Sequence, residues 1–229
     1  MQKDPGETLV VGGGYIAVEC AGFLNGLGKK VHLVNRSTFL RAMDSDMADK
    51  IVEDMEDDGV NTMTQTTIQS AQRLESGKIE VKLVVKGEEK TLEVDTVLTA
   101  IGRDADLKSL GVENAGISST WGKIEGRNGE PERTNIDNIY AVGDCVLNVP
   151  ELMPVAQKSG KLLAHRLNMR RSQVAEDIIM ERFSTDYRHI PTTVFSPTEY
   201  SFVGLSESEA ISAHGEDGIE VYHREALPL

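Results

Sequence analysis

A run of small residues near the amino terminus carries the clearest chemical signal in this sequence. Residues 12–17 read Gly-Gly-Gly-Tyr-Ile-Ala and fit the pattern G-x-G-x-x-A of turns that bind dinucleotides. In such a turn Gly12 permits a tight bend, Gly14 lets a pyrophosphate approach the backbone, and Ala17 lets a helix pack closely on a strand. The amino-terminal N–H groups of that helix would face the phosphates. A glycine run can also be a structural turn without a ligand, so the flanking elements decide between the two interpretations.

The residues around the glycines predict the elements that a dinucleotide turn requires. Residues 7–11 form a short apolar run rich in branched side chains, which predicts a strand. A helical pattern follows and ends at Gly26 and Gly28, and residues 31–35 predict a second strand. A strand, a helix and a strand in this order form a parallel crossover unit. This context favours the binding interpretation.

The end of the second predicted strand indicates which nucleotide would bind. In NAD-binding proteins an acidic side chain at this point accepts hydrogen bonds from the ribose. Here the chain reads Asn35-Arg36-Ser37, with Arg41 shortly after. Two guanidinium groups can form paired hydrogen bonds to a 2′-phosphate that a carboxylate would repel, so the sequence favours NADPH. The alternative is that Arg36 and Arg41 are solvated loop charges.

A second helix, an antiparallel meander and a returning strand are expected before residue 103. Asp44 is placed to cap a helix that ends before Gly59. Residues 96–101 predict a buried strand that ends at Gly102-Arg103. The meander is predicted from three runs separated by turns that contain glycine, namely residues 70–74, 79–85 and 90–94.

The middle of the chain predicts a different kind of structure. Residues 104–138 are rich in glycine and predict an irregular stretch at a domain crossing. Residues 139–142 predict a buried strand that is stopped by Gly143-Asp144. The helix expected next has Pro154 in its first turn, where proline is tolerated, and continues to Leu167.

The last part of the chain predicts a strand, a helix and another strand. A polar, charged segment over residues 168–186 separates it from the helix before it. Residues 191–195 predict the first strand, and Ser206 with Glu209 has the spacing of a capping box for the helix. Residues 219–223 predict the second strand.

Seven stretches, in order along nearly the whole chain, resemble the pyridine nucleotide-disulfide oxidoreductase family, and within it the large, animal-type thioredoxin reductases. The Glu-Cys-Ala-Gly-Phe-Leu helix and the Arg-Ser pair favour the thioredoxin reductases, whereas the glycine turn and the Gly-Asp motif are shared with glutathione reductase and dihydrolipoamide dehydrogenase. The matching stretches are residues 10–24, 35–41, 44–51, 100–104, 139–144, 151–156 and 190–197.

This resemblance implies an α/β fold with three parts. Residues 1–103 would form a Rossmann-like NADPH-binding domain with a three-stranded antiparallel meander. Residues 104–186 would be the second segment of a split FAD-binding domain. Residues 187–229 would begin an α+β interface domain, and a domain cut there would leave unpaired edges and exposed apolar surface, so poor solubility or partial disorder is expected at that end.

The resemblance also implies roles for residues on the nicotinamide side. Tyr15 and Ile16 follow the glycines, and Tyr15 matches a gate residue whose ring covers the flavin until nicotinamide displaces it. Glu19 matches an acid that pairs with a lysine beside the flavin. Gly102 and Arg103 match residues that line the nicotinamide and adenosine-phosphate side.

Five further residues are implied to bind FAD. Asp144, next to Gly143, matches the acid that accepts hydrogen bonds from the ribityl chain. The stretch Leu152-Met153-Pro154 matches a helix start that points at the flavin ring and stabilises negative charge on the reduced flavin.

The reaction implied by the resemblance is electron transfer from NADPH through FAD to a disulfide, and then to thioredoxin, in a homodimer. A glutathione reductase-like enzyme and a stand-alone NADP(H)-binding module are the alternatives. The chain contains neither the redox C-x-x-x-x-C pair nor the His-Pro-x-x-x-Glu motif, so we assign no catalytic residue and expect this chain alone to be inactive. Cys20 and Cys145 are interpreted as packing residues. No acid or cysteine partner is expected for the five histidines, His32, His165, His189, His214 and His223.

Composition excludes several other classes of function. The formal charge of −13, with scattered Lys and Arg, argues against a nucleic-acid partner. No apolar run approaches the roughly 20 residues that span a bilayer, and no signal peptide is expected. Two distant cysteines outside any Cys/His cluster predict neither a metal site nor a disulfide. We expect a cytoplasmic protein, with a mitochondrial form left open.

Overall fold

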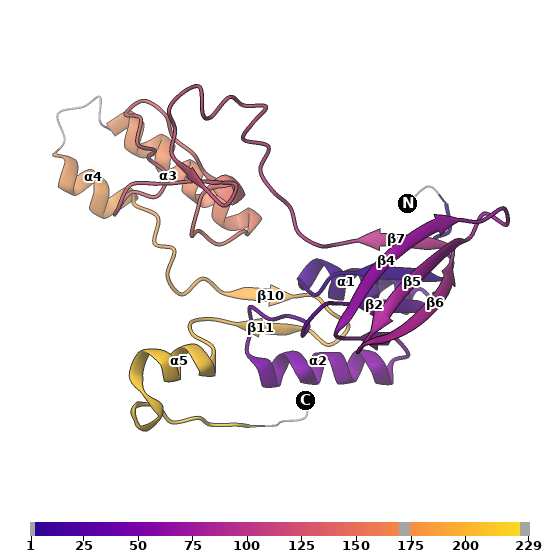
Figure 1. The fold of residues 1–229 in the computed structure, drawn as a ribbon. Helices are drawn as coiled ribbons and strands as arrows, with labels where there is room; N and C mark the ends of the chain where they lie inside the picture. The colour runs from indigo at the N-terminus through magenta and orange to yellow at the C-terminus, as the bar shows by residue number, and fades with distance from the viewer. Residues whose placement is uncertain (1–2, 170–174, 225–229) are drawn as a thin grey trace. The chain divides into compact units, whose positions relative to one another are not determined.

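The computed structural model describes residues 3–169 and 175–224, which form two compact units (Figure 1). Unit 1 is discontinuous and consists of Met1–Gly102 and Pro191–Leu229, and unit 2 is the intervening Arg103–Ile190. The assignment of the chain to NADPH, FAD and interface domains stays a prediction.

Unit 1 is built on a parallel sheet of order β3-β2-β1-β7. Its strands are β1 (Thr8–Val11), β2 (Val31–Val34), β3 (Asn61–Met63) and β7 (Thr96–Thr99). Helix α1 (Tyr15–Gly26) connects β1 to β2, and α2 (Ser45–Asp57) connects β2 to β3. The predicted strand, helix and strand around the glycines are therefore confirmed.

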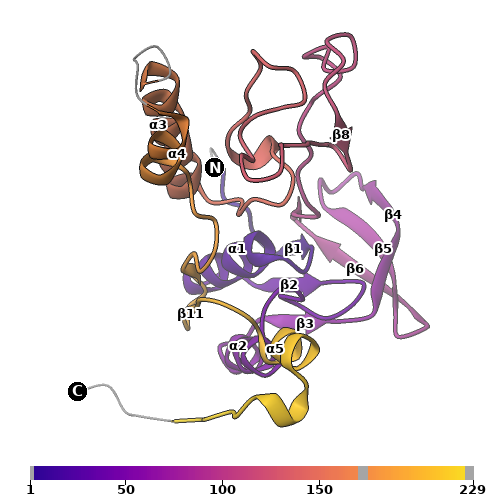
Figure 2. The same cartoon turned by 90° about the vertical axis from the view of Figure 1, so that its left-hand side faces the viewer.

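The two faces of this sheet are covered differently, as Figure 2 shows. Successive side chains of a strand point to opposite faces. Val10 packs with Ala17 of α1 and Ile51 of α2, whereas its neighbour Leu9 packs with Val81 of the meander. The sheet is thus buried on both sides, which holds its strand ends in fixed positions.

The meander is confirmed as a three-stranded antiparallel sheet of order β4-β5-β6. Its strands are β4 (Thr66–Arg73), β5 (Ile79–Val85) and β6 (Glu88–Val94), so β4 begins four residues before the predicted start at residue 70. The prediction that residues 96–101 form a buried strand is wrong in part. Because β7 lies at the sheet edge it is only half-buried, and Ile101 beyond it is 78% exposed.

Asp44 caps α2 as predicted. Its Oδ1 accepts hydrogen bonds from the backbone N–H groups of Asp46, at 3.1 Å, and Met47, at 3.4 Å. These N–H groups have no acceptor within the helix, so the cap stabilises α2 by giving them hydrogen-bond acceptors. In the part of the chain that the structure describes, no helix is long and apolar enough to cross a bilayer.

Unit 1 is completed by the segment that returns after unit 2. Strands β10 (Thr192–Val194) and β11 (Tyr200–Phe202) form an antiparallel hairpin, and α5 (Glu207–His214) follows with the predicted capping box. The predicted strand over residues 219–223 is wrong. The 3-10 helix η2 (Glu216–Gly218) leads into an irregular stretch there, because no described strand lies beside it to complete a ladder.

The described part of unit 2 consists of helices and short extended segments. It comprises β8 (Ser119–Thr120), β9 (Lys123–Ile124), the 3-10 helix η1 (Gly143–Cys145), α3 (Met153–Met169) and α4 (Glu176–Phe183). Pro154 lies in the first turn of α3, as predicted. Helix α4 falls within the segment predicted to be only a polar linker. Its eight residues bury Ile179, and its acids Glu176 and Asp177 lie at its positive end.

The predicted buried strand over residues 139–142 is also wrong. Tyr140 forms only an isolated bridge to Arg133, and Val142 is 36% exposed. A strand needs a neighbouring strand to satisfy its backbone groups, and the described part of unit 2 supplies only this bridge.

Hydrogen bonds to the buried Glu132 connect Tyr187, near the end of unit 2, with Arg166 of α3 in one polar cluster. Glu132 accepts hydrogen bonds from Arg166 Nη2, at 2.8 Å, and from Tyr187 Oη, at 2.7 Å. Burial raises the pKa of Glu132, but the hydrogen bonds from Tyr187 and Arg166 outweigh it and bring the pKa below its usual range. Burial and the adjacent Glu132 raise the pKa of Tyr187 to about 12. The cluster is therefore stable with Glu132 charged and Tyr187 neutral.

Candidate functional site

The glycine turn lies at the carboxyl end of β1, where its geometry requires glycine at the first position. Gly12 has φ +147°, and a Cβ there would lie 2.2 Å from the carbonyl oxygen of Ala100. The Gly12 N–H donates to the carbonyl of Val34 at 2.9 Å. Any side chain at position 12 would thus collide with the segment after β7, so only glycine fits at this position.

Gly14 is the N-cap of α1 and is exposed to solvent. A Cβ at Gly14 would meet no protein atom within 4 Å, whereas Ala17 is completely buried. Gly14 makes no side-chain cap, and the first N–H groups of a helix lack acceptors within it. Tyr15 and Ile16 are 44% and 38% exposed. The start of α1 can therefore be approached closely by an anionic group.

A loop after β2 carries the predicted phosphate-binding side chains. Arg36, Ser37 and Arg41 are all exposed. Across residues 3–169 and 175–224, neither guanidinium forms an ion pair. The backbone N–H of Leu40 donates to the carbonyl of Gly13 at 2.7 Å, which ties the loop to the glycine turn. The structure thus brings the arginine loop and the turn together.

Glu19 contacts the returning segment of unit 1. Its Oε1 accepts a hydrogen bond from the backbone N–H of Phe195 at 2.8 Å, so its partner here is a backbone amide. Its neighbour Cys20 is half-buried, and burial, followed by the Glu19 carboxylate, raises the pKa of the Cys20 thiol. A thiol with a raised pKa is a weak nucleophile, which agrees with a packing role for Cys20.

Gly102 and Arg103 lie at the crossing from unit 1 to unit 2. Gly102 has φ +121°, and both residues are exposed. Arg103 is the first residue of unit 2, whereas Gly102 belongs to unit 1. The implied contact of both residues with nucleotide stays a prediction.

Unit 2 brings the Gly-Asp turn and the start of α3 together. Gly143 has φ +76°, and a Cβ there would lie 3.1 Å from Cβ of Ala156 in α3. Asp144 is exposed, as is Met153 at the first position of α3. The Ala156 N–H donates to the carbonyl of Leu152 at 3.0 Å, which begins the helical hydrogen bonding. The predicted residues Asp144, Leu152, Met153 and Pro154 therefore occupy one region.

Lys123 was not expected in this region from the sequence. Its Nζ donates to the carbonyl oxygen of Asp144 and lies 2.8 Å from Glu151 Oε1. The lysine thus connects the Gly-Asp turn to the residue just before Leu152. A single lysine on a two-residue strand has no sequence signal that distinguishes it from a solvated one.

The prediction that no histidine has an acid partner is wrong for His32. His32 Nε2 lies 2.8 Å from Glu7 Oε1, and His32 Nδ1 lies 2.9 Å from Asn61 Nδ2. The hydrogen bond with His32 lowers the pKa of Glu7. Glu7 precedes β1 while the glycine turn follows it, so the pair lies toward the opposite end of the strands and gives the turn no catalytic base. No group of three or more metal-ligating side chains occurs among the described residues.

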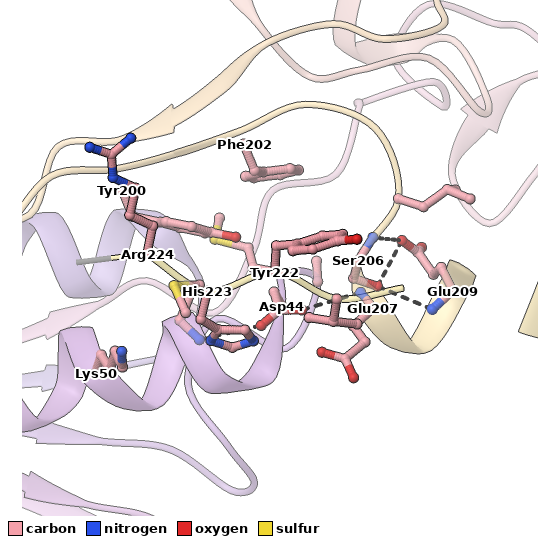
Figure 3. A pocket seen from close by; sticks show the side chains of 15 residues that line it. Asp44, Lys50, Tyr200, Phe202, Ser206, Glu207, Glu209, Tyr222, His223 and Arg224 are labelled. Carbon is pink, nitrogen blue, oxygen red and sulfur yellow. Dashed lines mark hydrogen bonds between the residues drawn. The ribbon is translucent and has the colours of Figure 1, made fainter. Parts of the chain in front are cut away.

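A cavity of about 460 Å³ lies between α2, β11, α5 and residues 221–224 (Figure 3). Two of its polar side chains, Asp44 and Ser206, are already engaged in capping helices. None of the lining residues is a predicted binding residue. They are Ala42, Met43, Asp44, Met47, Lys50, Tyr200, Phe202, Leu205, Ser206, Glu207, Glu209, Val221, Tyr222, His223 and Arg224.

Comparison with known proteins shows which family the chain resembles. Residues 1–160 match the model of the family described as pyridine nucleotide-disulphide oxidoreductase. Thioredoxin reductase SEP1 of Emiliania huxleyi is 41% identical over 240 aligned residues, which cover 100% of this chain and 46% of that protein.

Two solved structures of Escherichia coli RclA, a HOCl-induced flavoprotein disulfide reductase, are also similar. They are the Cu(II) complexes of the unmodified protein and of a cysteine-to-serine mutant, with TM-scores of 0.76 and 0.75. Both are 27% identical to this chain and cover 93% of it and 45% of their own length. The chain thus spans about half the length of the relatives it matches. On the family match and the shared fold, the chain belongs to the pyridine nucleotide-disulphide oxidoreductase family.

Proposed function

We propose that this chain is the NADPH-binding part, with a portion of the FAD-binding part, of a disulfide reductase that reduces thioredoxin. The observation that carries the nucleotide proposal is that the loop with Arg36 and Arg41 is connected to the glycine turn by the hydrogen bond from Leu40, and that its two guanidiniums form no ion pair with any residue that the structure describes. A pyrophosphate at Gly14 and a 2′-phosphate at the arginines would use both features. The 41% identity to a thioredoxin reductase supports thioredoxin as the substrate.

The residues of unit 2 fit the flavin that the family implies. The exposed Asp144 carboxylate can accept hydrogen bonds from the hydroxyl groups of a ribityl chain. The start of α3 at Met153 supplies partial positive charge for an electron-rich ring. FAD, when bound, accepts a hydride from NADPH and passes two electrons to a disulfide. The role of the protein is to hold Asp144 close to the start of α3. The close packing of Gly143 against Ala156 of α3 makes this possible.

The nucleotide proposal is tested by titrating the chain with NADPH and with NADH in a calorimeter. Arg36→Ala and Arg41→Ala should each weaken NADPH binding by about 1.5–3 kcal/mol, because each removes charged hydrogen bonds to phosphate. Binding of NADH should change little. Arg73→Ala on β4 is the matched control, since Arg73 is exposed in the same unit and donates only to the carbonyl of Gly77. Equal losses for NADPH and NADH would contradict the proposal.

The substrate is tested with the full-length protein. We propose a cytoplasmic homodimer that oxidises NADPH when oxidised thioredoxin is added. Glutathione disulfide as the faster substrate would favour the glutathione reductase-like alternative. Turnover with neither disulfide would favour a module that only binds NADP(H).

A further inference from the structure

We propose that Asn35 determines nucleotide specificity by positioning the arginine loop, although its own side chain does not contact the nucleotide. The loop in question is residues 35–41. This inference rests on the proposed NADPH binding and adds a residue to it. Asn35 directly follows β2, at the point where an acid would accept hydrogen bonds from the ribose of NAD.

Both polar atoms of the Asn35 side chain are already used within the loop. Its Oδ1 accepts from the backbone N–H of Arg36 at 2.8 Å, and its Nδ2 donates to the carbonyl of Thr38 at 2.7 Å. Only an amide supplies an acceptor and a donor in this arrangement. The side chain therefore fixes the path of the backbone through Arg36 and Ser37.

The backbone of Asn35 is itself held by the sheet. Its N–H donates to the carbonyl of Met63 at 3.0 Å, and its carbonyl accepts from the N–H of Thr66 at 2.9 Å. These contacts come from β3 and β4, so the base of the loop does not depend on the side chain. A change at the side chain should therefore alter the loop and leave the sheet intact.

The side chain also fits directly against the glycine turn. A Cβ built on Gly13 would lie 2.0 Å from Asn35 Nδ2. At the other end of the loop, Leu40 is buried, has φ +49°, and donates its N–H to the carbonyl of Gly13. Gly13 thus contacts the loop at both ends, beside Arg36 and beside Arg41. The pyrophosphate turn and the two arginines are coupled through this one residue.

This coupling gives Gly13 a function that the pattern G-x-G-x-x-A does not assign to its middle position. Gly13 is not among the residues with positive φ, so alanine is compatible with its backbone. The obstacle to alanine is the Asn35 side chain. Substitutions at Gly13 and Asn35 should consequently be non-additive.

The first test compares NADP⁺ and NAD⁺ binding by the full chain in Asn35→Asp. The carboxylate keeps the acceptor for Arg36 but loses the donor to Thr38 and adds a charge near the arginines. We expect the ratio of NADP⁺ to NAD⁺ affinity to fall by roughly tenfold or more. Asn25→Asp is the matched control, because Asn25 Nδ2 donates to the carbonyl of Asp58 at 3.0 Å, and it should keep the wild-type ratio.

If Asn35 had a purely structural role, Asn35→Asp would weaken the binding of both nucleotides equally, and that result would overturn the inference. An unchanged ratio in Asn35→Asp would overturn it as well. Far-ultraviolet circular dichroism shows whether each variant is folded. If the wild-type chain bound neither nucleotide, the proposed function itself would fail. If the wild type preferred NADP⁺ and the Asn35→Asp variant kept this preference, only the inference about Asn35 would be refuted.

The second test is a double-mutant cycle that does not depend on a new charge. Gly13→Ala should lower the ratio of NADP⁺ to NAD⁺ affinity in the wild-type background, because the methyl group displaces the Asn35 amide. In an Asn35→Ala background the same substitution should change the ratio little. Additive effects would show that Gly13 and Asn35 act separately and would overturn the coupling.

Discussion

Individual residues of the glycine turn have separable physical roles. Gly12 is required by the protein itself, since its φ is +147° and a side chain would meet Ala100. Gly14 faces only open space, so the protein alone gives no reason for glycine there. A turn that served structure alone would need the first glycine but not the second. The comparison of these two residues therefore separates a structural turn from a binding turn.

Gly12→Ala should lower the free energy of unfolding of unit 1, because the backbone is strained and the Ala100 carbonyl must move. Gly14→Ala should leave the unfolding midpoint in urea almost unchanged and still weaken NADPH binding, because the methyl group occupies the space that a pyrophosphate would use. Urea unfolding and nucleotide titration measure the two effects. If Gly14→Ala bound NADPH as tightly as the wild type, close approach of the pyrophosphate to this residue would be refuted.

Predictions from the sequence succeeded at this scale where the constraint is local. The glycine pattern and the Asp44 cap each reflect backbone geometry within a few residues. The contact of Asn35 with Gly13 and the bond between His32 and Glu7 join residues far apart in sequence. No spacing rule reveals such contacts, so these residues could not be assigned before the fold was known.

At the scale of elements, one helix-capping residue, Asp44, connects the two sequence segments of unit 1. Asp44 caps α2 through Oδ1, and its Oδ2 accepts from the backbone N–H of Glu207 at the start of α5, at 3.2 Å. One carboxylate thus serves the amino-terminal ends of two helices, where negative charge is favourable.

Asp44→Ala should destabilise unit 1 by about 1 kcal/mol through the lost cap of α2, and by more if the contact with α5 adds to it. Asp57→Ala is the control, since Asp57 is the last residue of α2, where an acid opposes the helix dipole. The control should not destabilise the unit. Chemical denaturation of both variants checks this, and equal losses would show that the cap contributes little.

The two segments that were wrongly predicted as strands share one cause. Residues 139–142 and 219–223 have strand-like composition, but a strand forms only where a neighbour satisfies its backbone groups. Helix α4 was missed for a different reason, because its eight residues offer too short a periodic pattern to stand out from a polar segment, whereas the equally short α5 was predicted from its capping box. Helices longer than this, and strands inside the crossover unit, were predicted well.

At the scale of the whole molecule, the buried cluster of Glu132, Arg166 and Tyr187 determines how unit 2 holds together. Glu132→Gln would leave Arg166 buried without its closest counter-ion, which typically costs about 3–5 kcal/mol. Because Glu130 Oε1 lies 3.9 Å from Arg166 Nε, we expect the lower end of this range.

Asp137→Asn is the matched control for this prediction. Asp137 pairs with Arg127 at 2.6 Å, but its side chain is 81% exposed, so solvent screens the pair. The free energy of unfolding should change little in this variant. A loss as large as that of Glu132→Gln would mean that burial is not what makes the cluster important.

The same cluster predicts how unit 2 responds to alkaline pH. The pKa of Tyr187 is raised from about 10 to about 12, so the folded state holds the phenol proton more tightly than the unfolded state does. This stabilisation is fully present below about pH 10 and is lost as the pH rises from about 10 to about 12. Tyr187→Phe should flatten this part of the stability profile. A slope that stays the same in the variant would assign it to another group.

The discontinuity of unit 1 sets an order of events during synthesis. Val194 is completely buried in the core beneath α1, and Phe195 donates to Glu19 of that helix, yet both residues follow the whole of Arg103–Ile190 in the chain. The first segment of unit 1 therefore leaves the ribosome with an incomplete core, which is completed only when Pro191–Leu229 has been translated. Unit 2 is one continuous segment, Arg103–Ile190, so its residues have all been translated before the second segment of unit 1 begins. Within this chain, translation thus begins unit 1 before unit 2 and completes it after unit 2.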